Sequence, residues 1–367
     1  MRILFIYQFC TLGGVEAVLR NRLAGLGARG VAVSLAFLDD LGGSETFRRA
    51  PGARLAFGRR ELARLLAEER FDFILPIDTP EAYALLRGAT KGAVVVTEVH
   101  SNHTPNLEYL HALAATGTRA VIAPSRHQRE LILHEFPAVQ RAGIPVHIVP
   151  NPIDTSRFRF AAPRQPLSRP VVGWVGRLEP QKNWRQFVAL ASALTHSGED
   201  LDFVLVGGER APTAVKETLR ALVSGPELVS RFRWVSRLPY ERMPAFYSLL
   251  AASGGCLVPT SLVEPFGMSV VEAMACSCPV VAPRIDAFTE LIEDGLSGLH
   301  FPSGDIAAAA ERVRRLLADA PLRERLRAGG LERIATHFTA EHSVERFLDV
   351  LGSLHRPAAA ACRGGEP

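Results

Sequence analysis

Short apolar runs alternate with segments of helical periodicity along most of the chain. In the first half the apolar runs predict strands at Ile3–Tyr7, Ala32–Phe37, Phe71–Ile77, Ala93–Val99, Ala120–Ala123 and Val146–Val149. The segments between them predict helices at Val15–Ala28, Arg60–Glu69, Pro80–Arg87 and Arg126–Glu135. Alternation of strand and helix is typical of a mostly parallel sheet with helices on both faces, so we predict an α/β fold.

A proline-rich stretch at residues 161–170 interrupts this alternation and predicts a linker. The strand pattern then restarts at Val171–Val175, Asp202–Val206, Phe232–Val235, Cys256–Val258 and Val280–Ala282. We therefore expect two Rossmann-like, doubly wound domains facing across a cleft, at residues 1–160 and 168–337. An amphipathic helix follows at Glu341–Leu354, within residues 338–355, and we expect a disordered tail at 356–367.

Composition fits a soluble globular protein of two domains, with 367 residues, 47% hydrophobic and 22% charged. The net charge of +4 gives little support to a nucleic-acid partner. Five cysteines form no regular framework that predicts disulfides or zinc. The start of the chain is too short for a signal peptide, and the uncharged run Ala245–Val263 contains Pro259 and two glycines. We expect a helix, a turn and a strand there, and a cytoplasmic protein.

Two carboxylates, Glu264 and Glu272, are separated by seven residues where a loop is predicted to open a helix. The apolar run before them predicts a buried strand, and Met268–Ala275 after Gly267 predicts a packed helix. At such a join the free N–H groups of the helix start attract anions, and open α/β sheets bind ligands there. Two carboxylates suit neighbouring hydroxyls, such as a ribose diol or a sugar edge. If the pair stood alone, the better interpretation would be a solvated helix residue at Glu272 and a loop charge at Glu264.

Two cations follow the first strand of the second half. Arg177 stands at the end of that strand and Lys182 before the next helix. A leaving nucleoside diphosphate gains negative charge, which such cations can stabilise in place of a metal. The alternative is a salt bridge of Arg177 with Glu179 and a solvated Lys182. We favour the first interpretation because only three of the 42 basic residues are lysine.

The first half supplies two weaker signals. Gly13 and Gly14 before a helix can form an anion-binding turn, although a glycine pair is more often a simple turn. His100 follows a buried strand, and a neutral imidazole there can hydrogen-bond a sugar hydroxyl. A single histidine is more often structural.

These segments together resemble the family 4 retaining glycosyltransferases of the GT-B fold. The matching pieces are Gly13-Gly14 with Glu16, His100, the stretches at 149–154, 175–183 and 204–208, and Glu264-Pro-Phe-Gly with Glu272-Ala-Met-Ala. The resemblance covers nearly the whole chain. It implies a nucleotide-sugar donor bound mainly by the second domain, an acceptor bound mainly by the first, and a final helix that crosses back.

The resemblance also implies roles for single residues. Arg177 and Lys182 would bind the diphosphate, with Gly14 closing over it, and Glu272 would bind the ribose hydroxyls. Glu264 would hold the donor sugar together with the backbone of residues 266–268, and His100 would contact the sugar near its reactive carbon. The remaining expected donor contacts are Gly13, Gly208, Arg237, Leu238, Phe266, Gly267 and Met268.

Such enzymes are usually assigned a front-face mechanism, in which the leaving phosphate helps to deprotonate the acceptor. We accordingly expect no metal and no cofactor besides the UDP- or GDP-sugar. The pair Asp200 and Asp202 spells the motif of metal-dependent transferases, but it precedes a strand, so we interpret it as a surface turn. Two alternatives stay open: a GT-B phosphorylase or synthase, and a sugar-nucleotide-binding protein without activity.

Two departures from the family pattern stand near the donor site. Ser277 replaces a usual glycine, a change that a helix cap tolerates. Asp286-Ala-Phe-Thr-Glu290 replaces a usual Gly-Gly before Pro-Glu, which bears on donor choice or loop mobility.

The acceptor is not readable; saccharide, lipid-linked and small-molecule acceptors, such as an aminocyclitol, all stay open. An arginine-rich segment allows weak contact with anionic lipid, but interleaved glutamates favour a solvated helix. Its arginines are Arg48, Arg49, Arg54, Arg59, Arg60, Arg64 and Arg70.

Overall fold

The first half of the chain forms a seven-stranded parallel sheet. The structure, a computed structural model, describes residues 1–11, 13–48, 53–165 and 167–355. The strand order is β3-β2-β1-β4-β5-β6-β7. The strands are β1 (Arg2–Cys10), β2 (Ala32–Asp40), β3 (Ala53–Phe57), β4 (Phe73–Ile77), β5 (Val94–Glu98), β6 (Thr118–Ala123) and β7 (Val146–Ile148).

Helices cover both faces of this sheet because alternate residues of each strand point to opposite sides. Along β1, Ile3 and Phe5 join one apolar cluster, whereas Leu4 and Ile6 join another on the opposite face. The helices of this half are α1 (Gly14–Ala28), α2 (Ser44–Arg48), α3 (Gly58–Glu68), α4 (Glu81–Leu86), the 3-10 helix η1 (Thr104–Thr116), α5 (Arg126–Glu135) and α6 (Pro137–Arg141).

The second half has its own parallel sheet, in the order β10-β9-β8-β11, and a bridge from Leu257 to Val280 adjoins the pair β12-β13 to it. These strands are β8 (Val171–Val175), β9 (Asp202–Val206), β10 (Phe232–Val235), β11 (Cys256–Leu257), β12 (Val281–Pro283) and β13 (Leu299–Phe301). Its helices are η2 (Pro180–Lys182), α7 (Trp184–His196), α8 (Thr213–Val223), η3 (Tyr240–Arg242), α9 (Met243–Ala252), α10 (Met268–Ala275), α11 (Asp286–Leu291) and α12 (Ile306–Ala318).

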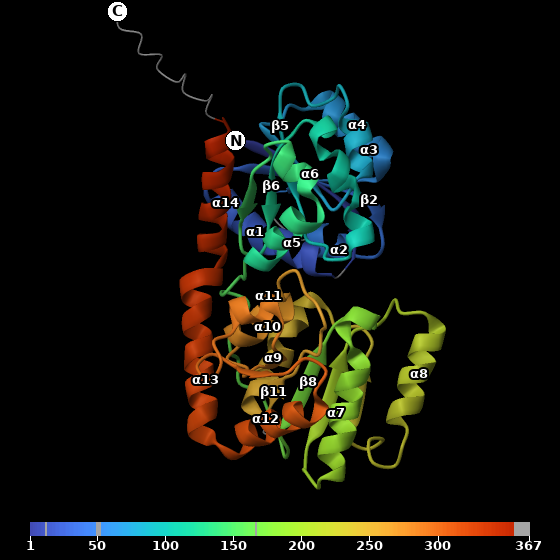
Figure 1. Ribbon diagram of the computed structural model, residues 1–367, viewed down its shortest axis with the longest axis vertical. Helices are drawn as coiled ribbons and strands as arrows, with labels where there is room; N and C mark the ends of the chain where they lie inside the picture. The colour runs from blue at the N-terminus through green and yellow to red at the C-terminus, as the bar shows by residue number, and fades with distance from the viewer. Residues whose placement is uncertain (12, 49–52, 166, 356–367) are drawn as a thin grey trace, which may run out of the picture.

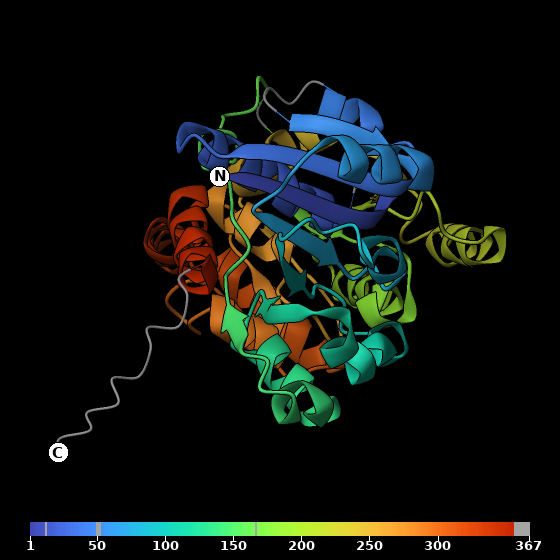
Figure 2. The same ribbon diagram turned by 90° about the horizontal axis from the view of Figure 1, so that it is seen from above.

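The last helices run along one side of both halves (Figure 1). They are α13 (Ala320–Arg333), a π-helical turn η4 (Ile334–Phe338) and α14 (Ala340–His355). The chain crosses back where the Ile153 N–H donates to the carbonyl of Phe338, at 2.9 Å. Helix α14 then packs on α1 so closely that a Cβ on Gly25 would lie 2.9 Å from Val344. Seen from above, these helices flank the first sheet (Figure 2).

The α/β prediction and the predicted final helix are therefore confirmed. The strands β8, β9 and β10 have the predicted limits. Strands β3 and β13 and the 3-10 helix η1 had no counterpart among the predictions. The domain limits 1–160 and 168–337 stay predictions, and the expected tail at 356–367 lies outside the described residues.

Candidate functional site

The loop between β11 and α10 turns sharply at Gly267, the residue before the helix. Its φ of 115° lies in a region that side chains rarely adopt, and a Cβ there would lie 2.6 Å from the ring of Phe288. Position 267 therefore requires glycine for two reasons: the positive φ of the turn, and the lack of space for a side chain beside Phe288. As at any helix start, the first N–H groups of α10 have no partner in a preceding turn.

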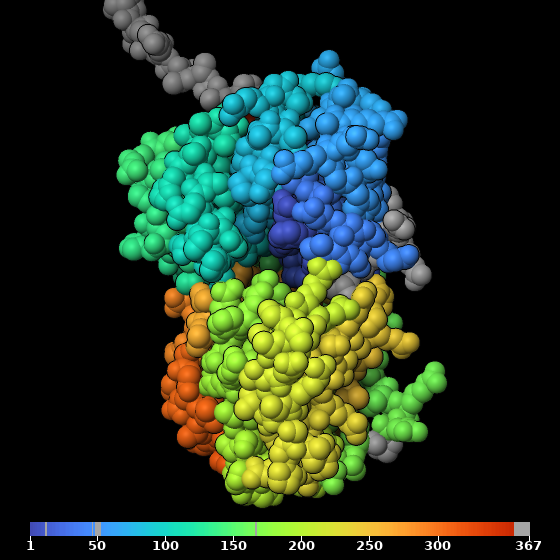
Figure 3. Space-filling view, turned by 90° about the vertical axis from the view of Figure 1, so that its right-hand side faces the viewer, coloured from blue at the N-terminus to red at the C-terminus, as the bar shows by residue number. Residues whose placement is uncertain are grey.

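The start of α10 faces the start of α1 across the two halves. A Cβ on Gly14, the first residue of α1, would lie 3.8 Å from Cγ of Met268, the first residue of α10. Figure 3 shows a recess at this seam, between the dark blue start of the chain and the green and yellow second half. Two helix N-termini therefore meet at one place, where both favour an anion.

Lys182 and Glu264 form an ion pair beside this recess. Nζ of Lys182 donates to Oε1 of Glu264 at 2.5 Å, and Oγ of Ser261 donates to the same oxygen at 2.7 Å. Glu264 is buried, whereas the Lys182 side chain is 21% exposed. The alternative of a solvated, unpaired Lys182 is therefore wrong.

Arg177 follows β8 and pairs with Glu179 at 2.8 Å, as the salt-bridge alternative expected. Its side chain is 70% exposed, and its charge still reaches the first half. There, burial and the carboxylates of Glu16 and Asp78 raise the pKa of Tyr7, and Arg177 partly offsets this rise. The Arg177 side chain is thus largely exposed to solvent despite its ion pair.

Glu272 lies within α10 and is buried. Its Oε2 accepts a hydrogen bond from the Tyr247 hydroxyl at 2.8 Å. Burial raises the pKa of Glu272 to about 8, although Tyr247 acts in the other direction. Among the described residues Oε1 has no partner, and it is not one of the fully enclosed atoms that lack one. One oxygen of Glu272 is therefore free for a ligand hydroxyl.

His100 follows β5 and is almost enclosed, with a side chain 6% exposed. Its Nε2 lies 2.9 Å from Oε1 of Glu98, and its backbone N–H donates to Asp78 at 3.0 Å. Asp78 adopts a left-handed φ of 42°, and burial raises its pKa to about 6. His100 is thus held at both its backbone and its ring.

Two family models match almost the whole chain between them. The model described as Glycosyltransferase Family 4 matches residues 12–157, and that described as Glycosyl transferases group 1 matches residues 156–333. The chain belongs to glycosyltransferase family 4.

Several curated relatives of this family 4 chain are glycosyltransferases. The alpha-maltose-1-phosphate synthase of Mycolicibacterium smegmatis is 30% identical over 260 residues, covering 66% of this chain and 65% of that protein. The 2-deoxystreptamine glucosyltransferase of Streptomyces kanamyceticus is 31% identical over 224 residues, covering 57% of this chain and 54% of that protein. The matched region spans between about half and two thirds of these relatives' own length.

Solved structures establish the GT-B fold of this family 4 member. Anabaena HepE, in complex with UDP and glucose, superposes with a TM-score of 0.81 at 21% identity, over 96% of this chain and 100% of that chain. A sucrose-phosphate synthase from Thermosynechococcus elongatus gives a TM-score of 0.78 at 21% identity, over 96% and 98% of the two chains. The expected family and fold are confirmed.

The other expected donor contacts of the family 4 chain fall into two groups. Gly13, Gly208, Gly267 and Met268 stand at strand-to-helix turns; a Cβ on Gly208 would lie 2.5 Å from the side chain of Leu178. The others are less available: Phe266 is buried in the core, Leu238 packs against that core, and Arg237 pairs with Glu209 at 3.2 Å.

The departure at residues 286–290 is the helix α11, which is a contact between the halves. The carboxylate of Glu290 accepts from the backbone N–H groups of Arg126 and His127, at 2.9 and 2.7 Å, and so caps α5. Asp286 lies 3.2 Å from the His127 ring. These contacts tie the segment to the first half, and the effects on donor choice and loop mobility stay predictions.

Ser277, the second departure, follows the C-terminal end of α10 with a left-handed φ of 57°. Glycine is usual there because a Cβ is strained in this conformation. The left-handed conformation predicts backbone strain at Ser277, and its tolerance in the cap stays a prediction.

Four residues around the site were missed by sequence reasoning: Tyr7, Arg22, Asp78 and Glu98. Glu98 had one available signal, because it lies two residues before His100 and so shares a strand face with it. Arg22 had none, since its partner comes from a distant strand.

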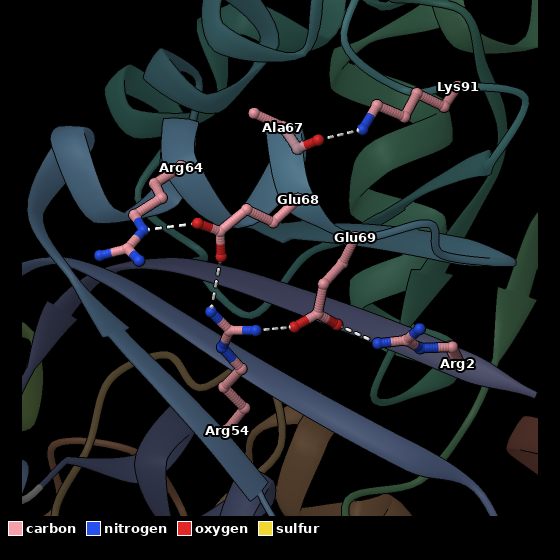
Figure 4. Close-up of polar contacts among 7 residues, drawn as sticks. All are labelled: Arg2, Arg54, Arg64, Ala67, Glu68, Glu69 and Lys91. Atoms are coloured by element: carbon pink, nitrogen blue, oxygen red, sulfur yellow. Dashed lines mark hydrogen bonds and ion pairs between the residues drawn. The ribbon is translucent and has the colours of Figure 1, made fainter.

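Part of the arginine-rich segment is paired with acidic side chains (Figure 4). Arg54 contacts Glu68 and Glu69, and Arg64 donates to Glu68 at 2.6 Å. This pairing favours the solvated-helix interpretation, and Arg49 lies outside the described residues. Lipid contact and a cytoplasmic location stay predictions.

In the part of the chain that the structure describes, no helix has the length and apolar character needed to cross a membrane.

Asp202 begins β9, and Asp200 lies two residues before it. Asp200 pairs with Arg169 at 2.7 Å and with Arg231. Across the described ranges no group of three or more His, Cys, Asp or Glu side chains could hold a metal ion.

Proposed function

We propose that the chain is a retaining glycosyltransferase that moves a hexose-type sugar from a UDP- or GDP-sugar to an acceptor hydroxyl without a metal. One observation carries the proposal. The Lys182–Glu264 ion pair and the free oxygen of Glu272 flank the point where the starts of α1 and α10 meet. Cations, helix N-termini and carboxylates together fit a diphosphate that is joined to hydroxyl-bearing rings.

In this proposal the diphosphate lies between the two helix starts, near Gly14. Lys182 and Arg177 would contact it. Each cation would either keep its ion pair, with Glu264 and Glu179 respectively, or break that pair to bind the diphosphate. Their charge would stabilise the diphosphate as its bond to the sugar breaks. The departing phosphate would take the proton of the acceptor hydroxyl on the same face of the sugar, so that the anomeric configuration is retained.

The hydroxyl groups of the donor would meet the carboxylates. Oε1 of Glu272 would accept from the ribose, and Glu264 with the backbone at residues 266–268 would hold the sugar. His100 would contact the sugar from the first half. The base would lie near Arg237 and Leu238, and the present pairing of Arg237 with Glu209 would then have to open.

The comparisons support the choice of donor and suggest acceptors to try. HepE has been solved with UDP-glucose at 22% identity, which makes UDP-glucose the first donor to test. The curated relatives include enzymes named for 2-deoxystreptamine and for alpha-maltose-1-phosphate. We propose acceptors of these two kinds, an aminocyclitol and a sugar phosphate, as the first panel.

The test is release of UDP from UDP-glucose with 2-deoxystreptamine or glucose 1-phosphate as acceptor, in the presence of a chelator. We expect acceptor-dependent release and an α-linked product by NMR. Lys182→Ala should lower turnover strongly, whereas Lys216→Ala, on α8, should not. Full activity of Lys182→Ala would contradict the site assignment, and a β-linked product would contradict retention.

The alternatives give different results in the same assay. If orthophosphate drove the reverse reaction, a phosphorylase would be favoured. If UDP bound in calorimetry without transfer to a broad acceptor panel, a binding protein would be favoured.

A further inference from the structure

Strand β5 delivers two chemically active side chains to one face of the first sheet. Glu98 and His100 are two residues apart, so the alternation of the strand points them to the same side. Val96, two residues earlier, joins the apolar cluster that α1 and α14 build on that face. Glu98 is thus buried beneath two helices, and His100 lies just past the C-terminal end of β5.

Arg22 of α1 neutralises Glu98. Its two terminal nitrogens donate to the two carboxylate oxygens at 2.9 and 2.8 Å, and both side chains are only 1% exposed. The guanidinium lies 4.5 Å from the ring centre of Phe347 on α14. Burial disfavours the charged form, yet Arg22 and then His100 outweigh it and lower the pKa of Glu98 to about 2. The carboxylate is therefore ionised at neutral pH.

An ionised carboxylate dictates which nitrogen of His100 carries a proton. Oε1 of Glu98 can only accept, so the Nε2 that lies 2.9 Å away must be the donor. In the neutral ring Nδ1 then carries no proton. Among the described residues Nδ1 has no hydrogen-bond partner, and it is not one of the fully enclosed atoms without one. It is an open acceptor.

A buried ion pair is a poor way to stabilise a fold. Removing two charges from water costs several kcal/mol, about as much as their attraction returns, and apolar residues of similar volume often do as well or better. The pair therefore calls for an explanation other than stability, and the contact of Glu98 with His100 supplies one.

We propose that Arg22 and Glu98 are positioning residues that fix His100 as the Nε2–H tautomer, so that Nδ1 accepts a hydrogen bond from a hydroxyl of the donor sugar. The second part rests on the proposed function, because it assumes a sugar at the seam. The first part does not. The ion pair thus acts through His100, and it has no contact with the substrate.

The tautomer is measured by NMR of protein labelled with ¹⁵N at histidine, with His100→Ala to assign the signal. In the wild type we expect a protonated Nε2 and an unprotonated Nδ1. The double variant Arg22→Met/Glu98→Leu removes both charges and should yield a mixture of tautomers. A protonated Nδ1 in the wild type, or an unchanged spectrum in the double variant, would overturn the proposal.

Thr97→Val is the matched control. Thr97 is the neighbour of Glu98 on the opposite face of β5, fully buried, and bonded to Tyr83 and Thr118. The variant disturbs an equally buried polar network but should leave the His100 signal unchanged. A similar change of tautomer in Thr97→Val would show that any core damage has this effect, and would contradict the specific role.

The link to the sugar is tested with UDP-glucose and water as acceptor. The double variant should lower kcat on the order of tenfold, the worth of one hydrogen bond, while the Kd of UDP stays within about twofold because UDP is held by other residues. Unchanged kcat with a changed tautomer would overturn the sugar contact. Failure of UDP to bind the wild type would instead refute the proposed function, and the NMR result would still stand.

Discussion

Two buried glutamates, one in each half of the molecule, differ in the charge they carry. Glu98 is 1% exposed and Glu272 is 6% exposed. Arg22 and His100 outweigh burial at Glu98 and lower its pKa to about 2, whereas burial dominates at Glu272 and raises its pKa to about 8. The difference is the partner, since among the described residues the Glu272 carboxyl has a hydrogen bond only with the Tyr247 hydroxyl. Burial alone therefore does not decide whether a carboxyl is ionised.

The two environments suit different tasks. Glu98 is charged at neutral pH and can hold Nε2 of the neighbouring His100 ring as a hydrogen-bond donor. Glu272 is poised between charged and neutral forms near physiological pH, so a ligand that donates hydrogen bonds can shift it. The carboxyl of Glu98, in the first half, thus has a fixed charge at neutral pH, whereas the charge of Glu272, in the second half, can change when a ligand binds.

Removal of Arg22 should have the largest effect, because it turns Glu98 into an unpaired buried charge. We expect Arg22→Met to lose about 3–5 kcal/mol of unfolding free energy, measured by urea denaturation at pH 7. The double variant Arg22→Met/Glu98→Leu should recover most of it. A loss below about 1 kcal/mol in the single variant is typical of a solvated ion pair, and it would contradict the burial of Glu98.

The raised pKa of Glu272 predicts a pH dependence of stability. Between the unfolded value of 4.5 and the folded value of about 8, the unfolded state binds fewer protons. The contribution of Glu272 to the free energy of unfolding should therefore be fully present below pH 4.5 and fall as the pH rises toward 8.

Glu272→Gln should abolish this part of the pH dependence, which denaturation at pH 6 and pH 9 can measure. The variant should gain stability relative to the wild type at pH 9. Parallel pH profiles of the two proteins would show that Glu272 is not protonated in the folded state.

Glu290 links the two halves by capping α5, and its loss should have a smaller effect. We expect Glu290→Ala to cost about 1 kcal/mol, the usual worth of a helix cap. Hydrogen exchange at the amides of Arg126 and His127 should become faster. Glu332→Ala on α13 is the control, and equal exchange in both variants would argue against the cap.

Ser277→Gly should give the smallest change, and a stabilising one. Relief of the left-handed strain is worth about 1–2 kcal/mol, and the greater freedom of unfolded glycine cancels about 0.4–1 of it. A net gain of about 0.5–1 kcal/mol in thermal or urea unfolding is expected. A loss of stability would mean that the Ser277 side chain makes a contact of value.

The sequence predicted elements well where apolar runs are uninterrupted, as in β8, β9 and α10. It missed β3, an edge strand that begins beside an arginine-rich stretch and in which only Ala56 is buried. It also missed β13, which has three residues. Such elements depend on neighbouring strands for their conformation.

For the site, local motifs placed Gly14, Gly267 and Lys182 at the ends of elements that meet. They did not predict that Lys182 pairs with Glu264, or that Arg22 reaches Glu98, because these partners are 82 and 76 residues apart. Tyr247, which bonds Glu272, was likewise beyond a local pattern. The charge states of these carboxyl groups depend on partners distant in sequence, which local sequence patterns do not predict.

The most direct test of the account is calorimetry of UDP binding at pH 7 in buffers of different ionisation enthalpy. If the ribose hydroxyls donate to Glu272, UDP binding should favour its ionised form and release protons. Comparison with Glu272→Gln cancels the protons of UDP itself. We predict proton release in the wild type beyond that in the variant; equal release in both, or no binding of UDP, would contradict the account.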